Sequence, residues 1–545
     1  MKDSLQKLVS AQAERTPDNR ALVFNDAEIS YAQLEERSNR LARMLSDQGC
    51  RSGDRIALFV PKSIEAIVGM LGVLKAGCAY VPIDLESPTA RVRRIFDACE
   101  PAAALVAAAG SELLHDCLAG SASPVRIVST TPGEPGDNRI QSHIDFSALD
   151  SFDSGPLDAG TGRGDLAHLL FTSGSTGTPK GVMITHGNVL AFVDWATRYF
   201  ATAAEDQISG HPPLHFDLST FDIFGSLSRG ATLHLVPPQL NLLAPKLAEW
   251  MRTSRLTQWF SVPSILTYMA KFDVVQNDDF PEMKRLLWCG EVLPTPTLRY
   301  WMERLPHVSF TNLYGPTEAT IASSFYTMER PPADEREDIP IGSPCDGEEL
   351  VLVEDDSLKP APPGSIGEIC IRGVGLSPGY WRDAEKTSQM FLADPDKPSS
   401  RVYKTGDLGR IDERGLFRYI GRTDSQIKSR GHRIELGEIE TALNGLGCLR
   451  ESAVVGVDTG GFEGTMICCA FASDPLDNVT PVILRRQLAA IIPSYMLPAR
   501  WHSYDRLPKN ANGKIDRSKI REAFKQEASE RAARAPEASK STEAV

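Results

Sequence analysis

The chain has 545 residues, more than a single hydrophobic core usually organises, so we expect at least two domains. Its composition, 42% hydrophobic and 24% charged, is typical of a globular protein and excludes collagen-like or wholly disordered chains. The formal net charge of -13 would repel a phosphate backbone, which argues against a nucleic-acid partner.

Targeting segments and cysteine clusters are not evident in the sequence. Residues 1–20 lack the apolar core of a signal peptide, and the most apolar helix-like stretch, residues 66–74, is too short to span a bilayer. We therefore expect no membrane association and a cytoplasmic location. The ten cysteines include no C-x-x-C pair, so we interpret them as mostly reduced, buried residues and not as a zinc cage or a disulfide framework.

The first clear elements predict a β-α-β unit. Residues 55–60 are a short apolar run, residues 63–74 have helical apolar spacing, and residues 79–84 are again strand-like. A helix is predicted at residues 245–253, where proline suits the first position. Further buried strands are predicted at residues 166–171, 232–236 and 286–288. This alternation favours an α/β core with parallel strands.

Residues 100–164 show only weak periodicity, and we assign no chemistry to them. From about Thr423 the pattern changes to short mixed elements, with strands predicted at residues 453–457 and 466–472, which fits a small α+β domain. Few bulky apolar side chains follow Lys525, so we expect either a frayed helix or disorder in this tail. The predicted regions are an N-terminal core (1–422), a C-terminal domain (423–525) and a disordered tail (526–545).

A loop rich in glycine and hydroxyl groups follows the predicted strand at residues 166–171. Its sequence, FTSGSTGTPKG, contains three glycines that permit close approach of the backbone, and its amides and hydroxyls can bind an anion. The loop can therefore wrap a polyphosphate. It differs from a Walker A loop, because the Gly-Lys pair of the chain, at Lys514, is followed by Ile515 and not by Ser or Thr. The alternative is a flexible surface linker.

A series of motifs runs through the chain in a fixed order. They are LKAGCAYVPID, FTSGSTGTPKG, FDLSTFDIF, NLYGPTEAT, GEICIRG, YKTGDLGR, GRTDSQIKSRGHRIELGEIE and LPKNANGKID. With these motifs, residues 10 to 520 resemble the adenylate-forming superfamily of acyl-CoA synthetases, luciferases and nonribosomal peptide synthetase adenylation domains. The segment WCGEVLP also resembles D-alanyl carrier protein ligases. The resemblance implies a large N-terminal domain of mixed sheets and helices and a small, mobile α+β C-terminal domain.

The resemblance also implies the chemistry. Members join a carboxylate to the α-phosphate of ATP, expel pyrophosphate and form an acyl-adenylate that a thiol can attack, so the site must neutralise charge and align the reactants. Glu318 would bind Mg²⁺, Asp407 would accept hydrogen bonds from the ribose, Arg422 would add a donor, and Tyr314 would stack on adenine. The other implied nucleotide-binding residues are Thr172, Ser173, Gly174, Ser175, Thr176, Gly177, Thr178, Lys180 and Gly315.

Lys514 matches the catalytic lysine of the superfamily. Its compact ammonium would lie between the substrate carboxylate and the α-phosphate, although an isolated lysine of this kind would be a solvated surface residue. Thr317 and Glu318 complete the implied catalytic set. Asp424 falls at the hinge position, so the C-terminal domain would swing after adenylation to admit a thiol.

Asp217 indicates the substrate class. Amino-acid-specific members pair an acid at this position with the substrate ammonium, whereas ligases for fatty or aryl acids generally lack it; the alternative is a helix cap beside Ser219. The other implied pocket residues are uncharged: Leu218, Phe221, Ser261, Leu287, Cys289, Leu313, Ile321 and Ala322. A charged substrate side chain would lose hydration there without gaining a partner, so a small uncharged amino acid is predicted.

The partner predicted for the second step is a carrier protein. No Gly-Gly-x-Ser carrier signature follows Lys514, so we expect the phosphopantetheine thiol on a holo acyl or peptidyl carrier protein supplied in trans, in peptide or polyketide natural-product biosynthesis. Two other functions stay open. An acyl- or aryl-CoA ligase using a non-amino acid and free coenzyme A would share every ATP motif. An adenylate-binding sensor would need a broken catalytic set, whereas Glu318, Asp407 and Lys514 are present.

Overall fold

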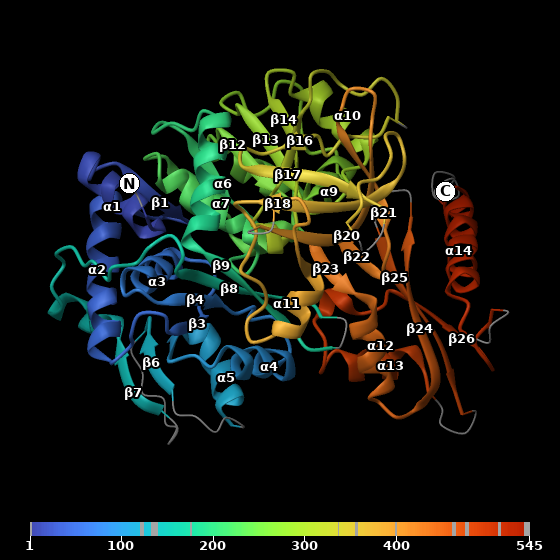
Figure 1. Ribbon diagram of the computed structural model, residues 1–545, viewed down its shortest axis with the longest axis horizontal. Coiled ribbons are helices and arrows are strands. Elements are labelled where there is room, and N and C mark those ends of the chain that lie inside the picture. The colour runs from blue at the N-terminus through green and yellow to red at the C-terminus, as the bar shows by residue number, and fades with distance from the viewer. Residues whose placement is uncertain are drawn as a thin grey trace, which may run out of the picture. The chain divides into compact units, whose positions relative to one another are not determined.

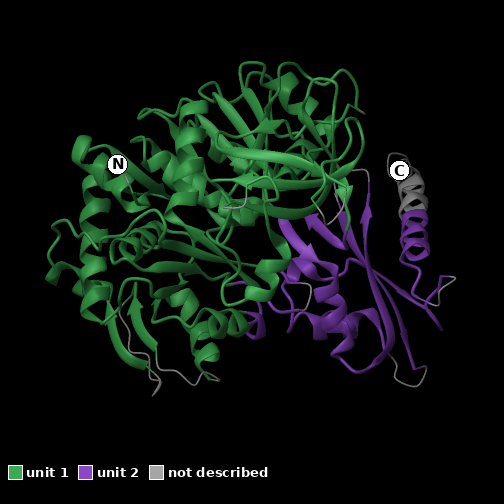
Figure 2. Ribbon diagram, in the orientation of Figure 1, with its two compact units in different colours: residues 1–85, 92–172, 180–423 green, residues 86–91, 173–179, 424–545 purple. Residues whose placement is uncertain are grey.

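The computed structural model describes residues 3–119, 125–131, 140–174, 177–335, 337–354, 358–397, 400–459, 465–474, 479–510 and 514–538. Figure 1 shows the helices and strands in chain order. The chain forms two compact units, coloured separately in Figure 2: unit 1 comprises residues 1–85, 92–172 and 180–423, and unit 2 comprises residues 86–91, 173–179 and 424–545. The main boundary between the units therefore falls between Thr423 and Asp424.

One sheet of unit 1 has the strand order β7-β6-β5-β3-β4-β8-β9. Its strands are β3 (Arg55–Phe59), β4 (Ala79–Pro82), β5 (Ala103–Val106), β6 (Val125–Ser129), β7 (Ile140–Asp145), β8 (Leu166–Thr172) and β9 (Lys180–Thr185). The accompanying helices are α3 (Ile64–Lys75), α4 (Thr89–Cys99), α5 (Ala108–Leu118) and η1 (Phe146–Ser151). Strands β3 and β4 pair in parallel with α3 between them in the chain, which confirms the predicted β-α-β unit.

Helix α3 is buried almost all round because its sequence, IEAIVGMLGVLK, is apolar on every face. Its glycines allow close neighbours: a Cβ atom at Gly72 would lie 2.7 Å from a methyl group of Leu41, and one at Gly69 would lie 2.3 Å from Leu105. The helix therefore packs tightly between α2 and the sheet.

A second sheet of unit 1 has the order β16-β15-β14-β13-β12-β10-β11-β1-β2. Its strands are β1 (Arg20–Phe24), β2 (Ala27–Ser30), β10 (Gln207–Gly210), β11 (Thr232–Leu235), β12 (Gln258–Ser261), β13 (Arg285–Cys289), β14 (Ser309–Tyr314), β15 (Ser324–Thr327) and β16 (Ser343–Pro344). Its helices are α1 (Leu5–Arg15), α2 (Tyr31–Asp47), α6 (His186–Tyr199), α7 (Asp217–Leu227), η2 (Pro238–Leu242), α8 (Ala244–Thr253), α9 (Pro263–Lys271), α10 (Thr295–Arg304) and η3 (Thr317–Ala319). Strands β10 to β14 are parallel, so their carboxyl ends share one edge, where ligands bind in sheets of this kind.

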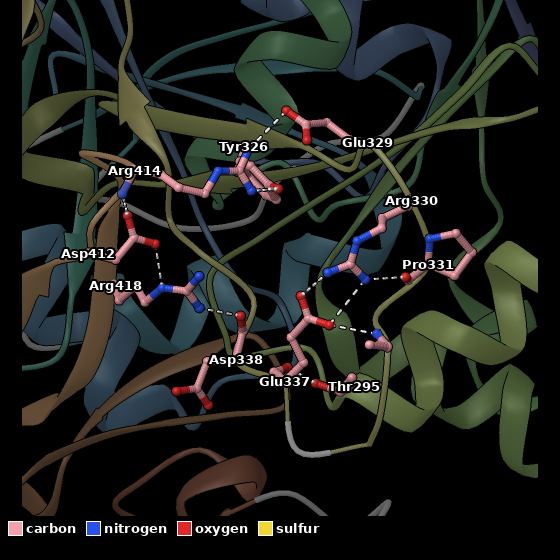
Figure 3. A network of polar contacts seen from close by, with 11 residues as sticks. Thr295, Tyr326, Glu329, Arg330, Pro331, Glu337, Asp338, Asp412, Arg414 and Arg418 are labelled. Carbon is pink, nitrogen blue, oxygen red and sulfur yellow. Dashed lines mark hydrogen bonds and ion pairs between the residues drawn. The ribbon is translucent and has the colours of Figure 1, made fainter.

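The third sheet of unit 1 is antiparallel. Its strands are β17 (Glu348–Val353), β18 (Gly367–Gly373), β19 (Phe391–Ala393), β20 (Arg401–Ile411) and β21 (Phe417–Arg422), with α11 (Ala384–Met390) before β19. Figure 3 shows polar contacts between the turn that joins β20 to β21 and the segment after β15. In them Arg414 Nη2 lies 3.0 Å from Glu329 Oε1, and Arg418 Nη1 donates to the Asp338 carbonyl at 2.6 Å.

Unit 2 is an α+β unit, as predicted for the C-terminal region. Its strands are β22 (Gln426–Ser429), β23 (His432–Glu435), β24 (Leu449–Asp458), β25 (Thr465–Ser473) and β26 (Arg500–Ser503), and its helices are α12 (Leu436–Asn444), α13 (Pro481–Leu488), η4 (Ser494–Met496) and α14 (Arg517–Ala538). Helix α14 continues through residues 526–538, where the sequence left a frayed helix or disorder open. Alanine, glutamate and arginine, which are good helix formers, make up most of this stretch. Residues 539–545 lie outside the described ranges.

None of the ten cysteines, all within the described ranges, forms a disulfide, and every one except Cys448 is buried. This confirms the interpretation of the cysteines as buried residues. No helix in the described part of the chain is long and apolar enough to cross a membrane.

Candidate active site

Asp217 is the first residue of α7. The N-cap of this helix is Phe216, which gives no side-chain cap, so Asp217 is not the cap residue that the alternative interpretation required. Burial raises the pKa of Asp217 to about 6, although hydrogen bonds from Thr317 and from the backbone of Leu218 and Ile321 favour its ionised form. Asp217 is therefore a desolvated carboxyl at a helix N-terminus.

The predicted pocket residues gather in one buried cluster. Those present in it are Leu218, Phe221, Leu287, Cys289, Leu313, Ile321 and Ala322. The cluster also contains Phe192, Trp195, Ala196 and Phe200 from α6 and the residue after it, together with Phe260 and Cys345. The register of β13 and β14 sets Cys289 beside Leu313, so both side chains lie on one face of the sheet. The cluster is apolar, and its member Leu218 directly follows Asp217 in the chain.

Ser261 is a polar neighbour of Phe260 on β12, and its place in the pocket stays a prediction. Its hydroxyl accepts a hydrogen bond from Trp259 Nε1 at 2.9 Å and lies 3.3 Å from the Val262 carbonyl, within donating distance. Because side chains alternate along β12, the residue that enters the cluster from this strand is Phe260, which lies in register with Leu287. The alternation of side chains between the two faces of β12 is the sequence signal that could have identified Phe260 as a member of the cluster.

A buried polar chain links β14, β20 and β21. Tyr314 Oη donates to Asp407 Oδ2 at 2.6 Å, and Arg422 pairs with Asp407 Oδ1 and also donates to the Thr405 carbonyl at 3.0 Å. Burial and the neighbouring Asp407 raise the pKa of Tyr314 well above its usual value. The ring of Tyr314 packs in a buried cluster with Phe417, and its stacking on adenine stays a prediction.

Glu318 lies on η3 between Thr317, which hydrogen-bonds to Asp217, and a strained backbone segment. Glu318 is 1% exposed, and its Oε1 accepts a hydrogen bond from Tyr380 Oη at 2.8 Å. Thr320 and Ile321 have φ values of 57° and 72°, which are unfavourable for β-branched residues and typical of functional sites. Sequence reasoning missed Tyr380, because it lies 62 residues from Glu318 in the chain.

Gly315 precedes this segment and makes its geometry possible. A Cβ atom at Gly315 would lie 2.5 Å from Ala322 Cα, so no other residue fits at this position. Within the same unit, Thr172 of β8 and Lys180 of β9 are paired in register, and Lys180 Nζ lies 5.9 Å from the centre of the Tyr380 ring.

Unit 2 holds most of the predicted phosphate loop. Ser173 Oγ donates to the Arg433 carbonyl at 2.6 Å, the backbone N–H of Gly177 donates to the Gly174 carbonyl at 3.0 Å, and Thr178 is exposed. Gly177 has φ +80°, which requires glycine or a strained residue. Ser175 and Thr176 lie outside the described residues.

Unit 2 also carries Lys514 and Asp424. Lys514 is exposed and lies on a turn in which its backbone N–H donates to Asn510 Oδ1 at 3.0 Å and its carbonyl accepts from Asn510 N at 2.8 Å. Asp424 is the first residue of the main segment of unit 2, and its Oδ1 accepts from Gln426 N at 3.1 Å.

The residues present fit a Mg²⁺ ion that takes most of its oxygen ligands from the substrate phosphates and water. Glu318 supplies one buried carboxylate, and no group of three or more His, Cys, Asp or Glu side chains suited to a metal occurs among residues with described positions. Mg²⁺ is often bound by one or two carboxylates together with substrate phosphates and water, which matches this donor set.

Two family models match the chain. The model for AMP-binding enzymes matches residues 9–381, and the model for the AMP-binding enzyme C-terminal domain matches residues 438–514. Adenylate-forming enzymes of this kind use ATP. The second match falls entirely within unit 2.

Individual relatives agree with the family models. The chain is 36% identical to L-proline--[L-prolyl-carrier protein] ligase of Streptomyces coelicolor, with 94% of each protein covered. It is 34% identical to part of surfactin synthase subunit 2 of Bacillus subtilis, where 95% of the chain spans 14% of that protein. The fold is similar to the Vibrio cholerae adenylation domain AlmE in complex with glycyl-adenosine-5'-phosphate, with a TM-score of 0.83, 23% identity and coverage of 97% and 98%.

Proposed function

The chain belongs to the family of AMP-binding enzymes, and from this membership we propose that it activates a small uncharged amino acid with ATP as an aminoacyl-adenylate. It then transfers the aminoacyl group to the phosphopantetheine thiol of a carrier protein. The observation that carries the proposal is Asp217, a desolvated acid that directly precedes Leu218 of the apolar cluster. A relative that loads proline onto a carrier protein supports the second step.

In the first step, Asp217 binds the ammonium of the amino acid. Burial makes the ionised carboxylate costly in the empty pocket, so a cationic partner restores a favourable interaction through a charge-assisted hydrogen bond. Thr317 holds the Asp217 carboxylate by a hydrogen bond. The apolar cluster then receives the side chain, and its hydrocarbon walls exclude charged groups.

The nucleotide is positioned by residues from several elements. Tyr314 and Arg422 each donate to one oxygen of Asp407 and so fix the orientation of its carboxylate. The remaining lone pairs of the carboxylate accept hydrogen bonds from the ribose hydroxyls. Within unit 1, Thr172 and Lys180 would bind phosphate oxygens, as the family motif implies. Glu318 would hold Mg²⁺, which when bound neutralises charge on the phosphate oxygens.

The chemistry then needs alignment and charge neutralisation. A carboxylate oxygen of the amino acid attacks the α-phosphorus of ATP, the bond from that phosphorus to the bridging oxygen breaks, and pyrophosphate leaves. Lys514 supplies a positive charge where negative charge builds up in the transition state. Afterwards the carrier thiolate attacks the acyl carbon, and AMP leaves. We propose that rotation about Asp424 separates the two steps.

The test is an ATP–pyrophosphate exchange panel. It compares small, large and charged amino acids of both hands, with benzoate and a fatty acid as controls, in wild type and Asp217→Ala. We expect exchange with a small uncharged amino acid and a loss of about a hundredfold or more in the variant. A best substrate that is charged or lacks an amino group would contradict the proposal.

A second assay separates the carrier from coenzyme A. A holo carrier protein and free coenzyme A are offered to the preformed adenylate, and the thioester is measured by mass spectrometry. We expect the carrier to be preferred. Equal transfer to free coenzyme A, with no gain from any carrier, would favour the acyl- or aryl-CoA ligase.

A further inference from the structure

Glu348, the first residue of β17, is a partly buried acid that the proposed mechanism does not use. Its Oε1 accepts a hydrogen bond from the backbone N–H of Gly375 at 2.7 Å. Its Oε2 is buried and has no hydrogen-bond partner within the described structure. A buried polar atom without a partner is costly, and such atoms in native proteins usually have a functional explanation.

Glu348 is one of the residues that line a small cavity beside the proposed amino-acid pocket. The side chains that Glu348 meets there include Phe192, Trp195, Ala322 and Cys345, all four of which belong to the apolar cluster. Ala322 is also one of the pocket residues predicted from the sequence. The cavity therefore shares wall residues with the pocket, and its volume of about 10 Å³ leaves room for one water-sized group such as a hydroxyl.

Two glycines leave room for the carboxyl in its observed position. A Cβ atom at Gly375 would lie 2.8 Å from Glu348 Oε1, and one at Gly373 would lie 2.7 Å from Oε2. The backbone can approach both oxygens only because these residues have no side chain. With Oε1 occupied by Gly375 N–H, the orientation of Oε2 is set before any ligand binds, which is the property expected of a binding group.

We propose that Glu348 is a specificity-determining residue, whose unpaired carboxyl oxygen hydrogen-bonds a hydroxyl group on the side chain of the amino-acid substrate. This inference rests on the proposed function, because it concerns the substrate of the same site. The inference restricts the proposed substrates to small uncharged amino acids that carry a hydroxyl group. The surrounding lining is apolar enough to contact the remaining carbons.

The protonation state of Glu348 favours a hydroxyl over a cation. Burial raises the pKa of Glu348 to about 8, so the carboxyl carries its proton near neutral pH. A protonated carboxyl can donate one hydrogen bond and accept another, as a hydroxyl can. A cationic side chain would instead require the carboxyl to ionise in a buried site.

The experiment compares amino acids that differ only by hydroxyl against methyl. The isosteric pairs are serine with 2-aminobutyrate, threonine with valine, and homoserine with norvaline, with 2,3-diaminopropionate as the cationic probe. In ATP–pyrophosphate exchange we expect the hydroxyl member of at least one pair to have a kcat/KM roughly tenfold or more above its methyl partner, because the site would otherwise leave a buried polar group unpaired.

Two variants test whether Glu348 causes this preference. Glu348→Leu should bring the ratio within that pair to about one. Glu348→Gln keeps an oxygen for Gly375 N–H and presents an NH₂ donor where the protonated carboxyl presents its O–H, so it should keep most of the hydroxyl preference. Glu349→Gln is the matched control, because this neighbouring side chain pairs with Arg372 and Lys397 outside the cavity, and its ratio should equal that of wild type.

The outcomes separate the inference from the proposed function. Absence of exchange with every amino acid would overturn both. Exchange that favours the methyl partners or the cationic probe would overturn the inference and leave amino-acid activation standing. A wild-type ratio in Glu348→Leu, with thermal unfolding unchanged, would show that Glu348 does not contact the substrate and would overturn the inference.

Discussion

Two polar networks of unit 1 use the same kinds of side chain in opposite surroundings. In the network of Tyr314, Asp407 and Arg422, the side chain of Asp407 is 3% exposed and that of Arg422 is 9% exposed. In the network of Figure 3, Arg330 is 61% exposed and its partner Glu337 is 34% exposed, with a distance of 3.1 Å between Nη2 and Oε1. Hydrogen-bond geometry alone does not distinguish the two.

Solvent makes the difference. Exposed ion pairs contribute about 0–1 kcal/mol, whereas removing one partner of a buried pair strands a charge and costs roughly 3–5 kcal/mol. The comparison teaches that the buried network should control stability and site geometry, while the network in Figure 3 should tolerate change. The following substitutions test this from the largest expected effect to the smallest.

Arg422→Met should have the largest effect. It leaves the buried Asp407 carboxylate without its charged partner, so we expect the free energy of unfolding to fall by roughly 3–5 kcal/mol. Denaturant unfolding followed by tryptophan fluorescence measures the change. Arg414→Met is the matched control, because Arg414 pairs with Glu329 where both side chains are more than half exposed. Equal losses in the two variants would contradict the comparison.

Lys514→Ala should lower the rate of adenylation without lowering the free energy of unfolding. Lys514 is exposed, so unfolding should not change, yet adenylation should fall by about two orders of magnitude or more because a transition-state charge is lost. ATP binding should be largely retained. Lys509→Ala, on the same turn and paired with Glu451, is the control and should stay active. Near wild-type adenylation by Lys514→Ala would refute the catalytic assignment.

The pH dependence of amino-acid binding should follow Asp217. Its pKa is raised to about 6, so the carboxylate that pairs with the substrate ammonium is lost as the pH falls through 6. We expect the KM for the amino acid to rise roughly tenfold between pH 7 and pH 5, since one proton must be displaced for binding. Exchange kinetics at each pH measure it, with the KM for ATP as the reference. A flat amino-acid KM would exclude Asp217 as the anchor.

Glu337→Gln should have the smallest effect. Glu337 accepts hydrogen bonds from Arg330 and from the backbone of Ala333, which lower its pKa, but the site is solvated. We expect the free energy of unfolding to change by less than about 1 kcal/mol and exchange activity to stay at the wild-type level. A larger loss by calorimetry would mean that the network in Figure 3 stabilises unit 1 more than its exposure indicates.

The sequence predicted elements with strong periodicity and missed those built from small residues. Helix α3 and its flanking strands were predicted because their apolar runs are long and bounded by turns. Strand β5, with the sequence AALV, and helix α5 lie in the stretch at residues 100–164 that gave no clear pattern. Alanine carries little signal for either period, although β5 is fully buried in the sheet.

The candidate site divides in a similar way. The motifs correctly predicted that Asp217, Leu313 and Ile321 lie in one region. Each of these residues is identified by its position within a short motif, so no long-range contact had to be predicted. The place of Ser261 in the pocket stays a prediction, because counting along a motif does not say which face of a strand a side chain occupies. Tyr380 and Glu348 could not be found, since their contacts with Glu318 and Gly375 join distant parts of the chain.

The close approach of Gly315 to Ala322 has a consequence for attempts to redesign the pocket by directed evolution. Ala322 belongs to the apolar cluster and is a natural position to diversify, but its Cα would lie 2.5 Å from any Cβ placed at Gly315. Libraries that randomise both positions together would therefore be filled with misfolded members. A library that keeps Gly315 and varies Leu287, Leu313 and Glu348 would explore new substrates without disturbing the strained turn at Thr320.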